Sequence, residues 1–304
     1  MTYRIRVEHV SRYRYAAPVQ SSYNETRLTP LTTPWQLVLD SRVTVEPATT
    51  LFGYVDYWGT VVHAFDLHQA HDELVITGRS VVETSHSPGD VFDGTPLPGL
   101  EWFRASPSTL TWAELETATG GRHAEFLAPT AQVPRDERLD EVAASIRWST
   151  AGSGGSGGSG PAAAAEAAVA WVGEQLRYVA GTTGVHTSAV QAWEGGEGVC
   201  QDFAHLTLAV LRAMAIPARY CSGYVHPHGD AAVGQTVRGE SHAWIEYWAG
   251  DWAPVDPTAG RSTGEHHVLV ARGRDYSDVP PVKGIFHGGP TVGLDVTVDL
   301  TRLA

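Results

Sequence analysis

Alternating apolar and polar residues dominate the first part of the chain. At the N-terminus, Tyr3, Ile5 and Val7 are separated by polar residues, and similar short runs recur as far as Val82. Successive side chains of a strand point to opposite faces, so this pattern predicts strands that are buried on one side. Turn residues separate the runs at short intervals, which is typical of antiparallel sheets. We therefore expect a β-rich domain over residues 1–85, folded as a sandwich or a barrel-like sheet.

The second half of the chain follows the helical period and then returns to alternation. Apolar residues recur every three or four positions after Pro161, and proline is favoured in the first turn of a helix. Helices are expected at 136–148, 161–179, 188–193 and 200–214. Strands are expected at 218–225, 240–248, 251–256, 267–271 and 292–300. These segments predict an α+β protein in which helices pack on an antiparallel sheet.

Between these two regions the chain loses its periodicity. Residues 86–135 contain six prolines, and residues 152–160 form a repeat of glycine and serine. Such a repeat favours a flexible loop, and the sequence leaves open whether it is natural or engineered. We therefore divide the chain into a β-rich domain at 1–85, a connector at 86–160 and a core at 161–304.

The overall charge argues against one class of partner. The chain has 34 acidic and 21 basic residues, which gives a net charge of −13 at pH 7. A surface of this sign repels phosphate, so we expect no nucleic-acid partner. The hydrophobic share of 42% is typical of a globular protein, and no apolar run approaches the ~18 residues of a membrane span. We expect no membrane partner either, and the oligomeric state does not follow from the sequence.

Cysteine content and the N-terminal sequence favour a cytoplasmic location. Cys200 and Cys221 are the only cysteines, too few for a disulfide framework, and a reducing compartment is the simpler assumption. The N-terminus alternates polar and apolar residues, whereas a signal peptide has a continuous apolar segment. We therefore expect a cytoplasmic protein.

Cys200 stands where a predicted helix begins. It follows Gly195, Gly196 and Gly198, which lack side chains and allow the loop to turn sharply and admit a substrate backbone. A helix N-terminus beside a histidine lowers the pKa of a thiol, because the dipole and an imidazolium both favour the thiolate. The first amides of a helix have no intrahelical acceptor, so the Cys200 N–H could donate to a developing oxyanion. Cys200 is therefore a candidate nucleophile.

A histidine and an aspartate follow on the predicted strands. His242 lies on the strand at 240–248, and Asp256 ends the next strand. Because side chains alternate, the two share a face only if the loop between the strands has an odd number of residues. We expect a three-residue loop, Trp248–Gly250, which places His242 opposite Asp256 with glycine in the left-handed position. Cysteine, histidine and aspartate would then serve as nucleophile, base and orienting group.

Each of these residues has an ordinary interpretation when it is taken alone. A cysteine at a helix start is usually a buried structural thiol, and an aspartate before a proline often begins a turn. Their conjunction, with glycines before the cysteine and consistent strand geometry, favours catalysis. Asp202 could cap the helix or contact the substrate. A second oxyanion donor could come from Gln201, Trp193 or Tyr178.

Metal binding is a weaker interpretation of the polar residues. His63, His68 and His71 lie close together in the sequence but lack metal-ligand spacing, so strand-edge histidines explain them better. No zinc-type spacing links the candidate ligands of the second region, which are Cys200, Asp202, His205, His226 and His228. We expect no metal and no cofactor.

The residues around the candidate triad resemble the transglutaminase-like superfamily, whose core is a papain-like cysteine protease fold. The resemblance rests on four motifs that occur in order, Gly198–His205, Ile216–Tyr220, Ser241–Trp244 and Asp256–Thr258. The N-terminal region is similar to the β-rich region that precedes the core in bacterial members, as seen in Asn24–Pro30 and Asp56–Gly59. The resemblance implies that Cys200 is the nucleophile, His242 the general base and acid, and Asp256 its orienter.

The family resemblance leaves several reactions open. Relatives with this triad include cross-linking acyltransferases, peptidases, amidases and inactive scaffolds. Because the chain shows no calcium-ligand cluster like that of the animal cross-linking enzymes, we expect amide hydrolysis through a thioester on Cys200, with a peptide or protein as substrate. Transglutamination of a protein glutamine is the alternative within enzymes. A catalytically idle protein-interaction module is the alternative from another class, and the intact triad argues against it.

Overall fold

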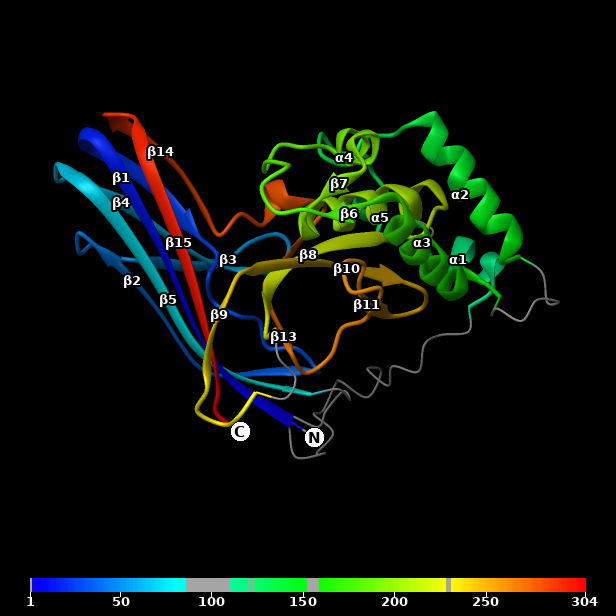
Figure 1. Ribbon diagram of the computed structural model, residues 1–304, viewed down its shortest axis with the longest axis horizontal. Helices are drawn as coiled ribbons and strands as arrows, with labels where there is room; N and C mark the ends of the chain where they lie inside the picture. The colour runs from blue at the N-terminus through cyan, green and yellow to red at the C-terminus, as the bar shows by residue number, and fades with distance from the viewer. Residues whose placement is uncertain (1, 86–109, 120, 122, 152–158, 228–230) are drawn as a thin grey trace.

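The computed structural model describes residues 2–85, 110–119, 121, 123–151, 159–227 and 231–304 (Figure 1). The larger antiparallel sheet consists of β1 (Thr2–Thr26), β2 (Gln36–Glu46), β3 (Phe52–Val55), β4 (Val61–Leu67), β5 (His71–Ser85), β9 (Thr236–Gly239), β14 (Val282–Gly288) and β15 (Thr291–Arg302). The smaller antiparallel sheet consists of β8 (Ala218–Val225), β10 (Ser241–Trp248), β11 (Trp252–Asp256), β12 (Arg261–Ser262) and β13 (His267–Gly273). A parallel pair consists of β6 (Arg177–Tyr178) and β7 (Glu197–Gly198).

Helices and short turns complete the fold. The helices are α1 (Trp112–Ala118), α2 (Glu137–Ser149), α3 (Pro161–Gln175), α4 (Ala189–Gly195) and α5 (Cys200–Ala213). Single 3-10 turns are η2 (Ala124–Phe126) and η3 (Tyr276–Asp278). The predicted α+β class, with helices packed on an antiparallel sheet, is confirmed.

Strand β1 is the central strand of the larger sheet. Its first half pairs with β5 on one side and β15 on the other, and its second half pairs with β4 and β14. Tyr3, Ile5 and Val7 are buried and the residues between them are exposed, as the alternation predicts. The strands form one curled sheet that extends away from the helices (Figure 1). Because these three side chains share a hydrophobic cluster with α5, the sheet and the helical region are packed together.

The C-terminal strands join the larger sheet. β15 pairs with β1 from Ile5 opposite Arg302 to Tyr15 opposite Thr291, and β9 and β14 belong to the same sheet. The segment 161–304, which the sequence groups as one core, therefore contributes strands to both sheets. The physical reason is that β1 would otherwise present a long unpaired edge, and β15 supplies its missing neighbour. Alternation shows that a strand is buried on one face, but it does not show which sheet the strand joins.

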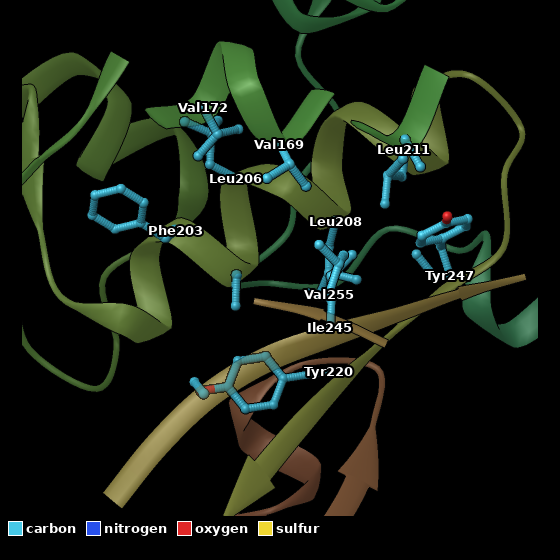
Figure 2. Close-up of a cluster of buried hydrophobic side chains, with 14 of the residues drawn as sticks. Val169, Val172, Phe203, Leu206, Leu208, Leu211, Tyr220, Ile245, Tyr247 and Val255 are labelled. Atoms are coloured by element: carbon cyan, nitrogen blue, oxygen red, sulfur yellow. The ribbon is translucent and has the colours of Figure 1, made fainter. Parts of the chain in front are cut away.

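The smaller sheet is covered on both faces. Leu208 of α5 packs toward Ile245 of β10 on one face, and Leu211 packs toward Tyr247 (Figure 2). On the other face, Leu31 packs with Cys221 and Trp244, and at the sheet edge its N–H donates to the carbonyl of Leu269 at 3.0 Å. Leu31 lies in the segment between β1 and β2, so the larger sheet holds the smaller one from behind. Strands β10 and β11 are therefore fixed between two packed layers.

Most expected elements lie close to their predicted bounds. Helix α5 begins at Cys200 as predicted, whereas α3 ends at Gln175, four residues early, because Arg177 and Tyr178 pair with β7. The predicted loop at 152–160 lies outside the described residues except for its last two positions, and so does 86–109 of the connector. None of the described helices is long and apolar enough to cross a membrane.

Candidate active site

Two glycines bring the chain to the start of α5. Gly196 ends α4 in the left-handed conformation, with φ of 67°, which other residues rarely adopt. Gly198 is packed against the first turn of α5, and a Cβ at this position would lie 2.6 Å from the Cβ of Asp202. The glycines before Cys200 therefore permit the sharp entry that the sequence suggests.

Asp202 caps the helix. Its carboxylate accepts a hydrogen bond from the Val199 N–H at 2.8 Å and another from the Thr183 hydroxyl at 2.5 Å. Burial raises the pKa of Asp202, and these two hydrogen bonds oppose that rise. Of the two roles that the sequence allows, the structure supports the cap. The cap fixes the helix terminus at which Cys200 stands.

The β10–β11 hairpin sets the relation of histidine to aspartate. Trp248 pairs with Trp252, which leaves a three-residue loop, and Gly250 in this loop has φ of 103°. The loop has the odd length that we predicted, although it begins one residue later than expected. His242 and Asp256 therefore share a face as diagonal neighbours and do not lie directly opposite each other.

Cys200, His242 and Asp256 form one hydrogen-bonded chain. His242 Nε2 donates to Asp256 Oδ2 at 2.7 Å, and the same imidazole is hydrogen-bonded to the Cys200 thiol. Because Nε2 is engaged by Asp256, Nδ1 is the nitrogen that faces the thiol. Burial lowers the pKa of His242, but the hydrogen bonds with Asp256 and Cys200 outweigh burial and raise it to about 9. His242 therefore carries a proton at neutral pH, beside the sulfur.

Asp256 accepts hydrogen bonds at both oxygens. Oδ1 accepts from the N–H groups of Thr258 at 3.0 Å and Ala259 at 3.3 Å, while Oδ2 accepts from His242 and from His267 Nε2 at 3.3 Å. Burial raises the pKa of Asp256, and the two imidazoles overcome this effect and hold it well below its usual range. The carboxylate is therefore ionised and fixed in orientation.

His267 is a site residue to which the sequence assigned no role. Its Nδ1 accepts a hydrogen bond from the Gly264 N–H at 3.3 Å, so its Nε2 carries the hydrogen that points at Asp256. No local signal could have found it, because it reaches Asp256 through the order of strands in the sheet. We regard His267 as a positioning residue for Asp256.

The imidazoles of this group also raise the question of a metal. Ligand atoms of His242, Asp256 and His267 lie within 4.8 Å of one another, a spacing that could hold an ion. A metal on His267 Nε2 would move the ring hydrogen to Nδ1, where it would face the N–H of Gly264. The hydrogen bonds therefore fit a clamp on Asp256 better than a metal site.

Removing the donor of His267 should slow the chemistry of Cys200. We expect His267→Leu to lower the rate of Cys200 alkylation by iodoacetamide roughly fivefold, since one hydrogen bond to Asp256 of ~1 kcal/mol is lost. His267→Gln can place an amide N–H at the same position and should restore most of the rate. Equal rates in the leucine and glutamine variants would show that this hydrogen bond does not position Asp256.

A cleft of about 490 Å³ opens beside the thiol. Of the candidate oxyanion donors, Gln201 and Tyr178 line this cleft, and the Gln201 amide makes only a long contact of 3.5 Å with the Gly184 carbonyl. Trp193 does not line it, because its indole N–H donates to Gln175 at 3.2 Å. The candidacy of Trp193 is therefore withdrawn, and two candidates stay in place.

The remaining polar candidates serve the fold. His205 is fully buried, and its Nε2 accepts a hydrogen bond from the Tyr276 N–H at 3.2 Å. Burial keeps the pKa of His205 below its ordinary value. Cys221 is buried and unpaired, and His228 lies outside the described residues. Within the described part of the chain, the second-region residues considered as metal ligands do not form a ligand group.

The fold is that of a papain-like core, with helices packed on an antiparallel sheet, preceded by a β-rich N-terminal region. Residues 149–257 match the transglutaminase-like superfamily, and residues 5–83 match the bacterial transglutaminase-like N-terminal region. The chain belongs to the transglutaminase-like superfamily.

Several known proteins are similar to this chain. An uncharacterized protein of Mycobacterium leprae is 46% identical over 99% of this chain and 100% of its own length. An uncharacterized protein of Mycobacterium tuberculosis is 31% identical over 98% of this chain and 93% of its own length. The crystal structure of a candidate cysteine protease from Cytophaga hutchinsonii has a TM-score of 0.70 and 19% identity, covering 100% of this chain and 92% of that one, and shares the fold.

A more local similarity concerns an acyltransferase. A segment of 67 residues, 20% of this chain, is 39% identical to a protein-glutamine gamma-glutamyltransferase of Pseudomonas aeruginosa. The match covers 10% of that protein.

Proposed function

We propose that the protein is a cysteine-dependent enzyme that acts on amide bonds through a thioester on Cys200. The observation that carries the proposal is the continuous hydrogen-bonded chain from Cys200 through His242 to Asp256. These hydrogen bonds end at Cys200, which stands at a helix N-terminus and lines a cleft, as a thiol nucleophile requires.

The geometry supports the following first half of the reaction. Cys200 attacks the amide carbonyl carbon as the thiolate, its proton being the one that His242 carries. The developing oxyanion accepts a hydrogen bond from the Cys200 N–H, which has no intrahelical acceptor. His242 gives its proton to the departing nitrogen, so the C–N bond breaks and an amine or ammonia leaves. The product is a thioester on Cys200 and a neutral imidazole, which Asp256 keeps in orientation.

The second half decides between two enzyme classes. In hydrolysis, neutral His242 takes a proton from water, which attacks the thioester and releases an acid. In transglutamination, an amine attacks instead and forms a new amide. We propose hydrolysis, and the local similarity to a glutamyltransferase supports the alternative. Incubation with a glutamine peptide and a primary amine separates them, because free acid indicates hydrolysis and an isopeptide indicates transfer.

Labelling of Cys200 tests the shared first half. We expect a thiol-directed peptide probe to label Cys200 in the wild type and to label His242→Ala at least roughly a hundredfold more slowly, since general base and acid groups contribute about 10²–10⁴-fold. Cys221 is fully buried and should not react in the folded protein. Equal labelling of both proteins would refute the proposed triad and favour an idle interaction module.

The location and the substrate class are part of the proposal. Both cysteines are free, which agrees with a reducing compartment, so we propose a cytoplasmic enzyme that acts on a peptide or protein. Fractionation of the native host, followed by detection of the protein with an antibody, tests the location. Recovery outside the cytoplasm would contradict it.

A further inference from the structure

The edge of the larger sheet beside the active site is only partly paired by the described strands. β15 pairs with β1 along one side, but on its other side it pairs with β9 only from Val298 to Thr301. Among the described residues, no strand pairs with this second side between 291 and 297. Figure 1 shows β9 beside the C-terminal part of β15 only. Within the described part of the chain, β15 therefore has no strand neighbour on this side where β9 leaves it.

The backbone of this edge presents unpaired groups. The N–H of Arg302 donates to Gln235 at 3.2 Å on the β9 side, while the N–H of Leu303 donates to Arg4 at 2.7 Å on the β1 side. Backbone groups alternate between the two sides of a strand. Leu294 and Val296 differ from Arg302 by even numbers, so their N–H and C=O groups point to the open side.

The side chains of the same residues continue the active-site cleft. Val296 and Val298 line the cleft that contains Cys200 and His242. Val298 is buried, whereas Val296 is 50% exposed and Leu294 is 51% exposed. Asp295, which alternates with them, forms an ion pair with Arg14 on the opposite face. The open edge thus has a charged outer face and an apolar face that leads to the thiol.

We propose that the open edge of β15, residues 292–297, binds the polypeptide substrate as an added strand and leads it to Cys200. The inference rests on the proposed function, because it names how the substrate of that site is held. β9 ends at Gly239, and the chain then enters the cleft through Glu240 and Ser241 to His242. A peptide strand on the open edge would occupy the same side of β15 as β9, beyond the point at which β9 ends.

The added strand also defines a substrate class. An extended peptide rises about 3.3 Å per residue, so four to six residues would cover roughly 13–20 Å of this edge. Alternate side chains of the peptide would lie beside Leu294 and Val296, which favours an apolar residue at every second position. Main-chain hydrogen bonds would supply affinity without requiring a particular sequence.

A second copy of this chain is the competing occupant of the edge. Exposed edges can pair with one another, and natural proteins often block them with charges. Here Val296 is part of the catalytic cleft, so a copy bound along 292–297 would obstruct the site. The position of the edge beside the cleft favours a substrate strand over self-association.

Peptide binding to the Cys200→Ala protein tests the proposal without catalysis. The probe is a fluorescent heptapeptide of alternating threonine and valine, ending in glutamine, and fluorescence anisotropy measures its binding. Leu294→Pro removes one backbone donor on the open side, and we expect binding to weaken roughly five- to tenfold, as for the loss of one hydrogen bond. The same peptide with alternate amides N-methylated should bind the unaltered edge equally weakly.

Matched variants separate the edge from the fold. Leu294→Lys replaces the apolar side chain, and it should also weaken binding even if Leu294→Pro proves unstable. Ile285→Lys makes the same change at a residue of β14 that is 73% exposed, and it should bind as the unaltered protein does. The proposal would be overturned if Leu294→Lys bound the peptide as tightly as the unaltered edge does. It would also be overturned if the N-methylated peptide bound as tightly as the unmethylated one. A dimer in sedimentation that Leu294→Lys dissociates would overturn it too.

The outcomes for the edge and for the chemistry can be told apart. Iodoacetamide is too small to use the edge, so its rate with Cys200 should be the same in Leu294→Lys and wild type. Normal peptide binding with no reaction at Cys200 would refute the enzyme and leave the edge intact. Reaction at Cys200 with no loss of binding in the edge variants would refute only the edge.

Discussion

Replacing Asp256 by asparagine should slow the alkylation of Cys200 at neutral pH by roughly tenfold to a thousandfold. A neighbouring opposite charge shifts a pKa by about 1–3 units, so the loss of the Asp256 charge should lower the pKa of His242 by this amount and remove the cation beside the thiol. In the wild type, burial lowers the pKa of His242, and hydrogen bonding to Asp256 is the largest of the effects that raise it. Without the carboxylate, burial prevails and His242 loses its proton near neutral pH. The thiol then lacks its cationic partner.

Asparagine is not a conservative replacement at this position. All four partners of Asp256 are hydrogen-bond donors, the N–H groups of Thr258 and Ala259 on one oxygen and the imidazoles of His242 and His267 on the other. A carboxamide can accept on one side only, and its NH₂ group must face two donors on the other. We therefore expect a loss of orientation in addition to the loss of charge.

The sign of the pH dependence identifies the group. Iodoacetate is attracted by the imidazolium and iodoacetamide is not, so the ratio of their rates with Cys200 reports the charge of His242. In the wild type this ratio should fall as the pH rises through about 9. The same charge also stabilises the folded protein. This contribution to the free energy of unfolding is fully present below the ordinary pKa of 6.5 and is lost as the pH rises through about 9. In Asp256→Asn the ratio should fall at lower pH.

A matched variant controls for the chemical change itself. Asp251 lies in the same hairpin, and its carboxylate accepts a hydrogen bond from the Trp252 N–H at 2.8 Å. It is not bonded to His242. Asp251→Asn should leave the ratio and its midpoint at the wild-type values. If Asp256→Asn also kept the wild-type midpoint, Asp256 would not be what maintains the charge of His242.

Local signals predicted the site well. Glycines and the start of helical periodicity located Cys200, and both depend on a few consecutive residues. The parity of the β10–β11 loop also depends only on the hairpin, and it correctly required His242 and Asp256 to share a face. The loop began one residue later than expected because several loop positions satisfy the same parity.

Nonlocal relations could not be predicted in this way. His267 reaches Asp256 only because β13 pairs with β8, and β8 with β10, a strand order that leaves no trace in local sequence. For the same reason β15 looked like a strand of the core, although it lies beside β1. The indole of Trp193 likewise points to Gln175, eighteen residues away in sequence. Each miss concerns a partner that tertiary packing selects.

Replacing Glu246 by glutamine should lower the free energy of unfolding by about 3–5 kcal/mol, the range for breaking a buried ion pair. Glu246 is 4% exposed and accepts hydrogen bonds from Arg219 at 2.6 Å and from Arg272 at 2.9 Å at each oxygen. Burial raises the pKa of Glu246, and the two guanidinium groups reverse this and lower it to about 2. A neutral amide would leave the two largely buried cations without an anion. Urea unfolding followed by circular dichroism measures the change.

Two comparisons show that the loss comes from burial and charge. Glu73→Gln removes an ion pair between Glu73 and Arg12, and each of these two side chains is 42% exposed. This variant should change the free energy of unfolding by less than ~1 kcal/mol. The stabilisation by Glu246 is present above its ordinary pKa of 4.5 and is lost as the pH falls toward about 2, so the two proteins should converge in acid. A loss below ~1 kcal/mol in Glu246→Gln would mean that water reaches the guanidinium groups. Because Glu246 shares β10 with His242, such access would also weaken the packing behind the site.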